Sequence, residues 1–170
     1  DYFGIGGIGA SFLNSGLLVV SFTMLLFILK TDITGTGLAA VFTVAGFALF
    51  GKNIFNVWFI VLGVYIYSSF QKERFRKYVY IAIFGTALSP LVTEIMFGLG
   101  YINPLTIILG AIAGMFIGFV LPPLSTYLLR VHQGFNLYNI GFTGGIIGTI
   151  LISVFKSYGF PIKTRIIWTS

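Results

Sequence analysis

The chain has 170 residues, of which 57% are hydrophobic and 8% are charged, so it lacks the polar side chains that cover a soluble domain, where roughly 25% of residues are charged. Its net charge of +6 comes from ten Lys/Arg and four Asp/Glu, and because the cations stand in short clusters between apolar runs, they are typical of membrane-protein loops and argue against nucleic-acid binding. The absence of Cys excludes disulfides and thiolate sites, and one His with few carboxylates leaves too few ligands for a metal, so we expect no metal and no cofactor.

A helix that crosses the lipid bilayer needs about 20 apolar residues. The sequence therefore predicts an all-α, polytopic transmembrane bundle that forms a single domain over residues 1–170. Because the chain begins at Asp1 without a signal-peptide n-region and ends in what resembles another apolar run, we expect a fragment of a longer protein. One form that such a protein could take is a duplication, in which this chain is one of two similar halves. The six hydrophobic segments are 6–29, 35–50, 54–70, 78–99, 104–129 and 135–155.

Segments 35–50 and 54–70 are short and are joined only by Gly51, Lys52 and Asn53. They could form two thin spans in a tight hairpin. They could instead be half-helices of a re-entrant pair, which is tolerated where protein or water covers the backbone. Lys52 and Asp32 are interpreted as interface charges at short loops, and Asn14 as a single hydrogen-bonding residue in segment 6–29.

Basic residues predict the orientation of the bundle. Four cations make loop 71–77 cytoplasmic, and Arg130 with His132 returns to the same side. A full span of segment 135–155 is favoured, although a re-entrant segment would fit the charge rule better. The full span leaves three cations outside: Lys156, Lys163 and Arg165.

Glycines recur at helical spacing in the last two segments. Such stripes let helices approach closely, and we expect them to serve helix packing, with the wall of a narrow pore as a compatible alternative. Pro122 and Pro123 are expected to interrupt segment 104–129 and to re-aim the residues that follow. The glycine stripes are Gly110, Gly114 and Gly118 in one segment and Gly141, Gly145 and Gly148 in the other.

Glu94 is the sharpest single candidate for a site, because an ionisable group within an apolar run is costly and usually faces a partner or a water path. It follows Thr93 closely. Pro90 lacks an N–H group, so the carbonyl of Thr86 should lose its helical partner and the helix should break. The alternative interpretation places Glu94 at the membrane interface in a structural role.

The densest polar cluster, residues 130–139, opens the last segment. If the helix starts near Gly134, Asn136 and Asn139 share a face in its first turns, close to unpaired N–H groups. Together with His132 and Thr143, such amides would suit a small polar or anionic solute. The alternative is an N-cap at the interface. No catalytic constellation is found, so we do not expect an enzyme.

Two stretches resemble a family of bacterial polytopic membrane proteins of unknown function. They run from Gly37 to Asn53 and from His132 to Gly145. The resemblance covers nearly the whole chain and implies a multi-pass protein of the bacterial cytoplasmic membrane, without implying an activity. Gly134-Phe135-Asn136 more faintly resembles a Gly-Phe-Asn-Gly motif of urea transporters, with Leu137 departing from it.

Two functional hypotheses follow. The first is a channel or transporter for a small polar solute, with a path lined by Thr93, Glu94, His132, Asn136, Asn139 and Thr143. The second is a non-transporting scaffold or assembly subunit that docks a partner helix on Gly110, Gly114 and Gly118. Besides the lipid bilayer and the solute, the expected partners are a second copy of the chain or a second half of the same protein.

Overall fold

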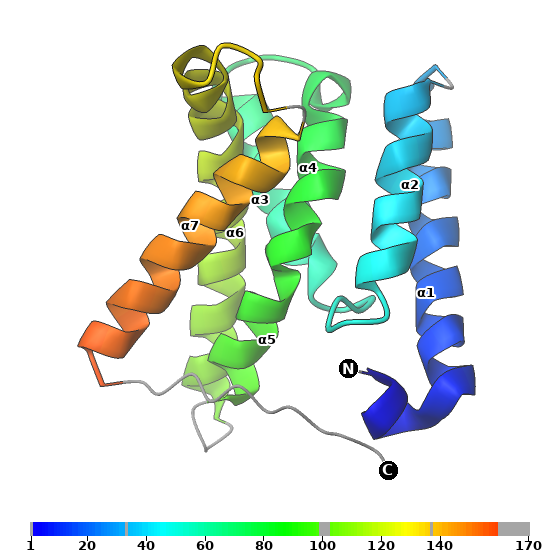
Figure 1. Ribbon diagram of the computed structural model, residues 1–170, viewed down its shortest axis with the longest axis vertical. Helices are drawn as coiled ribbons and strands as arrows, with labels where there is room; N and C mark the ends of the chain where they lie inside the picture. Colours follow the sequence, from blue (N-terminus) through cyan, green and yellow to red (C-terminus); the bar gives the residue numbers. More distant parts are fainter. Residues whose placement is uncertain (1, 33, 99–102, 137, 160–170) are drawn as a thin grey trace.

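The computed structural model describes residues 2–32, 34–98, 103–136 and 138–159, and its elements there are all helices (Figure 1). The expected all-α bundle of about six hydrophobic segments is confirmed. Within these ranges, four helical stretches are long and apolar enough to cross a membrane: α1, the stretch Phe75–Phe97, α6 and α7. The elements are α1 (Tyr2–Ile28), α2 (Gly35–Phe47), α3 (Val57–Phe70), η1 (Phe75–Tyr78), α4 (Val79–Gly85), η2 (Thr86–Leu88), α5 (Ser89–Phe97), α6 (Pro104–Val131) and α7 (Asn139–Ser157).

The helical stretch from Phe75 to Phe97 is broken at the position that the sequence predicted. The 3₁₀ turn η2 separates α4 from α5, and Pro90 stands in the first turn of α5. The carbonyl of Thr86 does not stay unpaired, because it accepts a hydrogen bond from the N–H group of Ser89. The tighter turn thus supplies the partner that proline cannot.

Helix α6 contains Pro122 and Pro123, where the sequence predicted a kink, and continues beyond them to Val131. The hydroxyl groups of Ser125 and Thr126 both donate to the carbonyl oxygen of Pro122, at 3.0 and 2.9 Å. At its other end, Asn103 and Thr106 form a capping box, which satisfies two donors at the start of the helix.

The glycine stripe of α6 packs against α3 and α5. A Cβ atom on Gly118 would lie 2.1 Å from the carbonyl oxygen of Ile60, and one on Gly63 would lie 2.1 Å from that of Met115. Gly110 meets Met96, and Gly114 meets Phe59 and Val92. These helices therefore approach to backbone contact, which only glycine permits.

The inward face of α7 differs from the predicted one. Gly144 and Gly148 are buried against Leu88, whereas Gly145 is exposed and has open space around it. Gly141 lies against the ring of Tyr138, on its own chain just before the helix. The stripe of Gly141 and Gly145 is therefore not a contact face between helices within the described residues.

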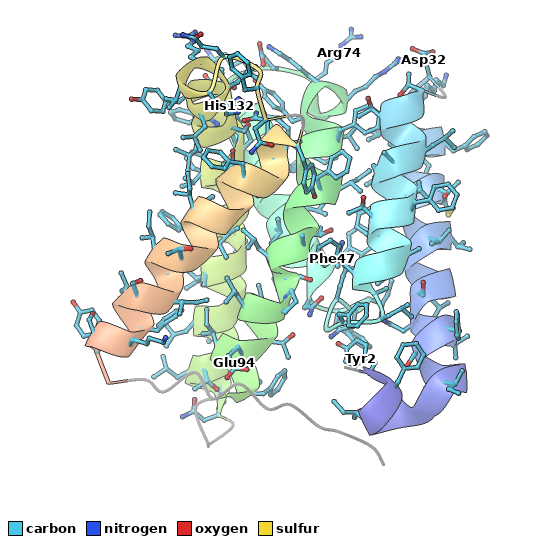
Figure 2. All side chains as sticks on the ribbon, viewed as in Figure 1. Tyr2, Asp32, Phe47, Arg74, Glu94 and His132 are labelled. Atoms are coloured by element: carbon cyan, nitrogen blue, oxygen red, sulfur yellow. The ribbon has the colours of Figure 1, made fainter. Side chains whose placement is uncertain are left out.

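Charged loops gather at one end of the bundle. Figure 2 shows Asp32, Arg74 and His132 at this end and Tyr2 and Glu94 at the other. Arg76 and Asp32 form an ion pair of 3.1 Å that joins η1 to the loop after α1. Hydrogen bonds from Lys77 and Tyr78 lower the pKa of Glu73 in the same region. We call this side the basic end.

Replacing Gly118 with Ala tests the contact between α3 and α6. The added methyl group forces two backbones apart, so we expect the free energy of unfolding to fall by about 1–3 kcal/mol. Thermal unfolding of the detergent-purified protein, followed by circular dichroism, measures the change. The matched control is Gly145→Ala, which should be neutral or slightly stabilising because that methyl group meets nothing within 4 Å. Equal unfolding midpoints for the two variants would contradict the contact.

Candidate functional site

Helices α2 and α3 are too short to cross a bilayer. With 13 and 14 residues and a rise of about 1.5 Å per residue, each spans roughly 20 Å of the 30 Å hydrocarbon core. Both have their outer ends at the basic end, and the loop that joins them, residues 48–56, stops short of the opposite end and is bonded to α1 and α5 (Figure 1). Their lengths fit the predicted pair of half-helices better than two spans, and we call the pair the re-entrant hairpin.

The loop of the hairpin is held by side chains of α1. Asn14 Nδ2 donates to the carbonyl oxygens of Ala48 and Lys52, at 2.8 and 2.9 Å. Tyr2 Oη donates to the carbonyl oxygen of Gly51 at 3.0 Å. In the last turn of α2, just before the loop, the carbonyl oxygen of Ala45 accepts a hydrogen bond from Ser15 Oγ at 2.9 Å. Backbone carbonyls that are shielded from water thus receive donors from a neighbouring helix.

Two asparagines close the loop internally and connect it to α5. Asn53 and Asn56 each accept, through Oδ1, a hydrogen bond from the other's backbone N–H group, at 2.9 and 3.0 Å. Asn56 Nδ2 donates to the carbonyl oxygen of Gly51 and to Thr93 Oγ1. Gly51 itself has a φ of 108° and lies against the ring of Pro90. Thr93, predicted as a pathway residue, therefore belongs to this cluster.

Lys52 is buried at the tip of the hairpin. Its side chain has no exposed surface, and among the described residues its Nζ atom has no hydrogen-bond partner. The ring of Phe47 lies 5.4 Å from this atom, within the range of a cation–π contact. The interpretation of Lys52 as an interface charge was wrong, because the loop that carries it folds into the bundle instead of facing water.

The predicted amide cluster lies at the basic end. His132 Nε2 and Asn139 Oδ1 are 2.8 Å apart, and Asn139 Nδ2 donates to the carbonyl oxygen of Ser125 at 2.9 Å. Because the amide nitrogen of Asn139 is used in this way, its oxygen accepts and His132 Nε2 carries the proton. Thr143 Oγ1 donates to the carbonyl oxygen of Asn139 at 2.8 Å. This network joins α6 to α7.

Asn136 does not share a helical face with Asn139. Helix α7 begins at Asn139 instead of near Gly134, because Gln133 and Gly134 have φ values of 50° and 84° and end the preceding helical path. The side chain of Asn136 accepts from the N–H group of Tyr138 at 3.0 Å, as in an Asx turn. The predicted pairing of the two amides on one face was therefore wrong.

An open cavity of about 770 Å³ lies between the hairpin and the rest of the bundle. It has a mixed wall of apolar side chains and uncharged hydrogen-bonding groups, and the predicted site residue Asn139 is part of it. The polar side chains that line it are Thr36, Thr43, Ser125, Thr126, Tyr138 and Asn139.

The predicted site residues thus separate into three places. His132, Asn136, Asn139 and Thr143 lie at the basic end, Thr93 at the hairpin loop, and the partly exposed Glu94 at the opposite end from His132 (Figure 2). The sequence analysis missed Tyr2, Asn14, Lys52, Asn53 and Asn56 as one cluster. A signal for them was present, because a lysine and two asparagines stand between two apolar runs that are too short to span.

A protein family described as "Protein of unknown function (DUF1576)" matches residues 1–157 of the chain. No curated protein and no solved structure matches it.

Replacing Asn14 with Ala tests the attachment of the hairpin loop to α1. Two loop carbonyls lose their donor, so we expect the free energy of unfolding to fall by about 2 kcal/mol or more. Thermal unfolding in detergent measures this. Ser21→Ala is the matched control on the same helix, because the exposed Ser21 hydroxyl donates only to the carbonyl of Leu17 in its own helix. If both variants unfold at the same temperature, Asn14 does not hold the loop.

Proposed function

We propose that this chain, which belongs to the DUF1576 family of proteins of unknown function, is part of a channel or transporter for a small polar solute. The observation that carries the proposal is the re-entrant hairpin. Two half-helices meet in a loop whose polar groups lie inside the bundle, bonded to α1 and to Thr93 of α5. Interrupted helices of this kind are tolerated at membrane depth where they line a solute path, and they form the binding sites of many transporters.

The cavity beside the hairpin supports the same function. Its hydroxyl and amide groups offer donors and acceptors without a fixed charge, which suits a small polar solute. Thr36 and Thr43 of α2 lie on one side of it and Asn139 of α7 lies among the groups on the other. We propose that the solute enters through this cavity and then reaches the hairpin loop.

Below the cavity, buried apolar residues close the path in this conformation. Val44 and Ala48 of the hairpin belong to the same core cluster as Ile83 and Phe84 of α4. Passage of a solute therefore needs a displacement of α2 relative to α4. Such alternation between open and closed states is the working principle of many carriers and gated channels.

The basic end defines the proposed orientation. Because cytoplasmic loops carry an excess of Lys and Arg, we propose that loop 71–77 and the cavity mouth face the cytoplasm and that the protein lies in a cytoplasmic membrane. On this orientation α7 runs away from the cytoplasm, and Lys156 lies near its outer end. Lys163 and Arg165, the other two cations of that side, lie outside the described residues.

The scaffold alternative relied on a free glycine stripe. Gly110, Gly114 and Gly118 are instead in contact with α3 and α5 of the same chain. A partner helix would have to displace those helices, so the stripe gives the scaffold hypothesis no support.

Filling the cavity tests the proposed path. Ala39 lines the cavity, whereas the neighbouring Leu38 is exposed and does not. In proteoliposomes of the full-length protein, Ala39→Trp should reduce uptake of a permeant solute about tenfold, and the matched control Leu38→Trp should leave it unchanged. Stopped-flow light scattering with urea, glycerol, formate and nitrate measures the uptake. Wild-type vesicles that admit none of these solutes faster than empty vesicles would count against the function, and equal inhibition by both variants would count against the path.

A further inference from the structure

The tip of the re-entrant hairpin carries a buried lysine amine that has no carboxylate partner among the residues that surround it. The groups bonded to the loop are the neutral side chains of Tyr2, Asn14 and Thr93. Both ion pairs of the described residues, Arg76–Asp32 and Lys77–Glu73, lie at the basic end. Neither includes Lys52, so its ammonium group is neutralised by no carboxylate within 4 Å in the part of the chain that is described.

A buried ammonium group of this kind is costly to keep. Its hydration is lost, and no hydrogen bond within the described residues replaces it. The loop does not depend on the charge, because it is held through backbone carbonyls and the Lys52 side chain donates to none of them. An ionisable group at this depth commonly marks the route or binding site of a charged solute.

Phe47 occupies the place next to the ammonium group. Its ring lies 5.4 Å from Lys52 Nζ, at the end of α2 where the loop begins, and its side chain is 41% exposed. Figure 2 shows Phe47 at this inner end of the hairpin. A half-exposed ring can rotate away without disturbing a packed core, and its removal would uncover the charge.

We propose that Lys52 binds a small monovalent anion as it passes the hairpin, and that Phe47 covers the site when the anion is absent. This inference rests on the proposed transport function and specifies its substrate class. A single positive charge among neutral amides matches a single negative charge. Arg130, which lines a second cavity at the basic end and forms no ion pair within the described residues, raises the local concentration of anions on that side.

The test uses full-length protein in proteoliposomes, with nitrate and formate as anions and urea as the neutral control. Lys52→Met should lower the flux of both anions at least about tenfold and leave any urea flux unchanged, because a whole charge is lost from a shielded site. Lys52→Arg should retain the anion flux. Phe47→Ala should raise it, whereas Phe42→Ala on the exposed side of α2 should not. Lys156→Met controls for the loss of a positive charge elsewhere.

A second measurement separates binding from transport. Titration with nitrate should raise the unfolding temperature of the wild-type protein in detergent and should not raise that of Lys52→Met, since a ligand stabilises only the form that binds it. Anion flux and nitrate stabilisation that are unchanged by Lys52→Met would overturn the proposal. Uptake of urea without uptake of anions would overturn it too, while leaving the transport function in place. Lysine-dependent nitrate stabilisation without any flux would support the site and contradict transport.

Discussion

Backbone groups that are shielded from water must find their hydrogen bonds inside the protein, and the loop of residues 48–56 makes the fold depend on this constraint. Its carbonyl groups are served by Asn14 and Tyr2 from α1 and by Asn56 from within the loop. Tyr2 reaches the loop because α1 bends at Gly7, where φ is 76° and ψ is 174°. The bend in α1, the asparagines and the two short helices therefore act together to satisfy the backbone hydrogen bonds of the loop.

The two halves of the hairpin are held very differently. Helix α3 touches α6 through glycine, with Gly63 and Gly118 at backbone contact, so it cannot shift without separating two well-packed helices. Helix α2 borders the open cavity through Thr36, Ala39 and Thr43, and it packs on α1 and α4 without a backbone contact of the glycine type. A conformational change would accordingly move α2 and leave α3 in place. The cavity and Phe47 lie on the movable half.

Features that depend on local chemistry could be predicted from the sequence. Apolar length indicated the spans, Pro90 predicted the break between α4 and α5, and the spacing of Gly110, Gly114 and Gly118 predicted close packing. Features that depend on the path of a loop could not be predicted in this way. Lys52 was interpreted as an exposed interface charge because charged loop residues usually face solvent, and only the fold of the hairpin into the bundle buries it.

The start of α7 shows a second limit. An amide pair at i and i+3 predicts a shared helical face, but the left-handed Gln133 and Gly134 delay the helix until Asn139. One amide then bonds across to α6, and the other turns its own loop. The sequence therefore identified the polar cluster correctly, but helical periodicity placed Asn136 in α7 when it lies in the loop before that helix.

The choice of partner for Lys52 bears directly on what the hairpin can do. A carboxylate beside the ammonium group would neutralise it permanently, and a mobile anion could then compete only poorly for it. An aromatic ring attracts a cation more weakly, through its quadrupole, and carries no charge of its own. Phe47 therefore offers the ammonium form of Lys52 a weak partner and supplies no counter-charge. This arrangement suits a site that exchanges its counter-ion with a solute path, and it explains why a lysine, with its cost of burial, stands at the tip of the loop.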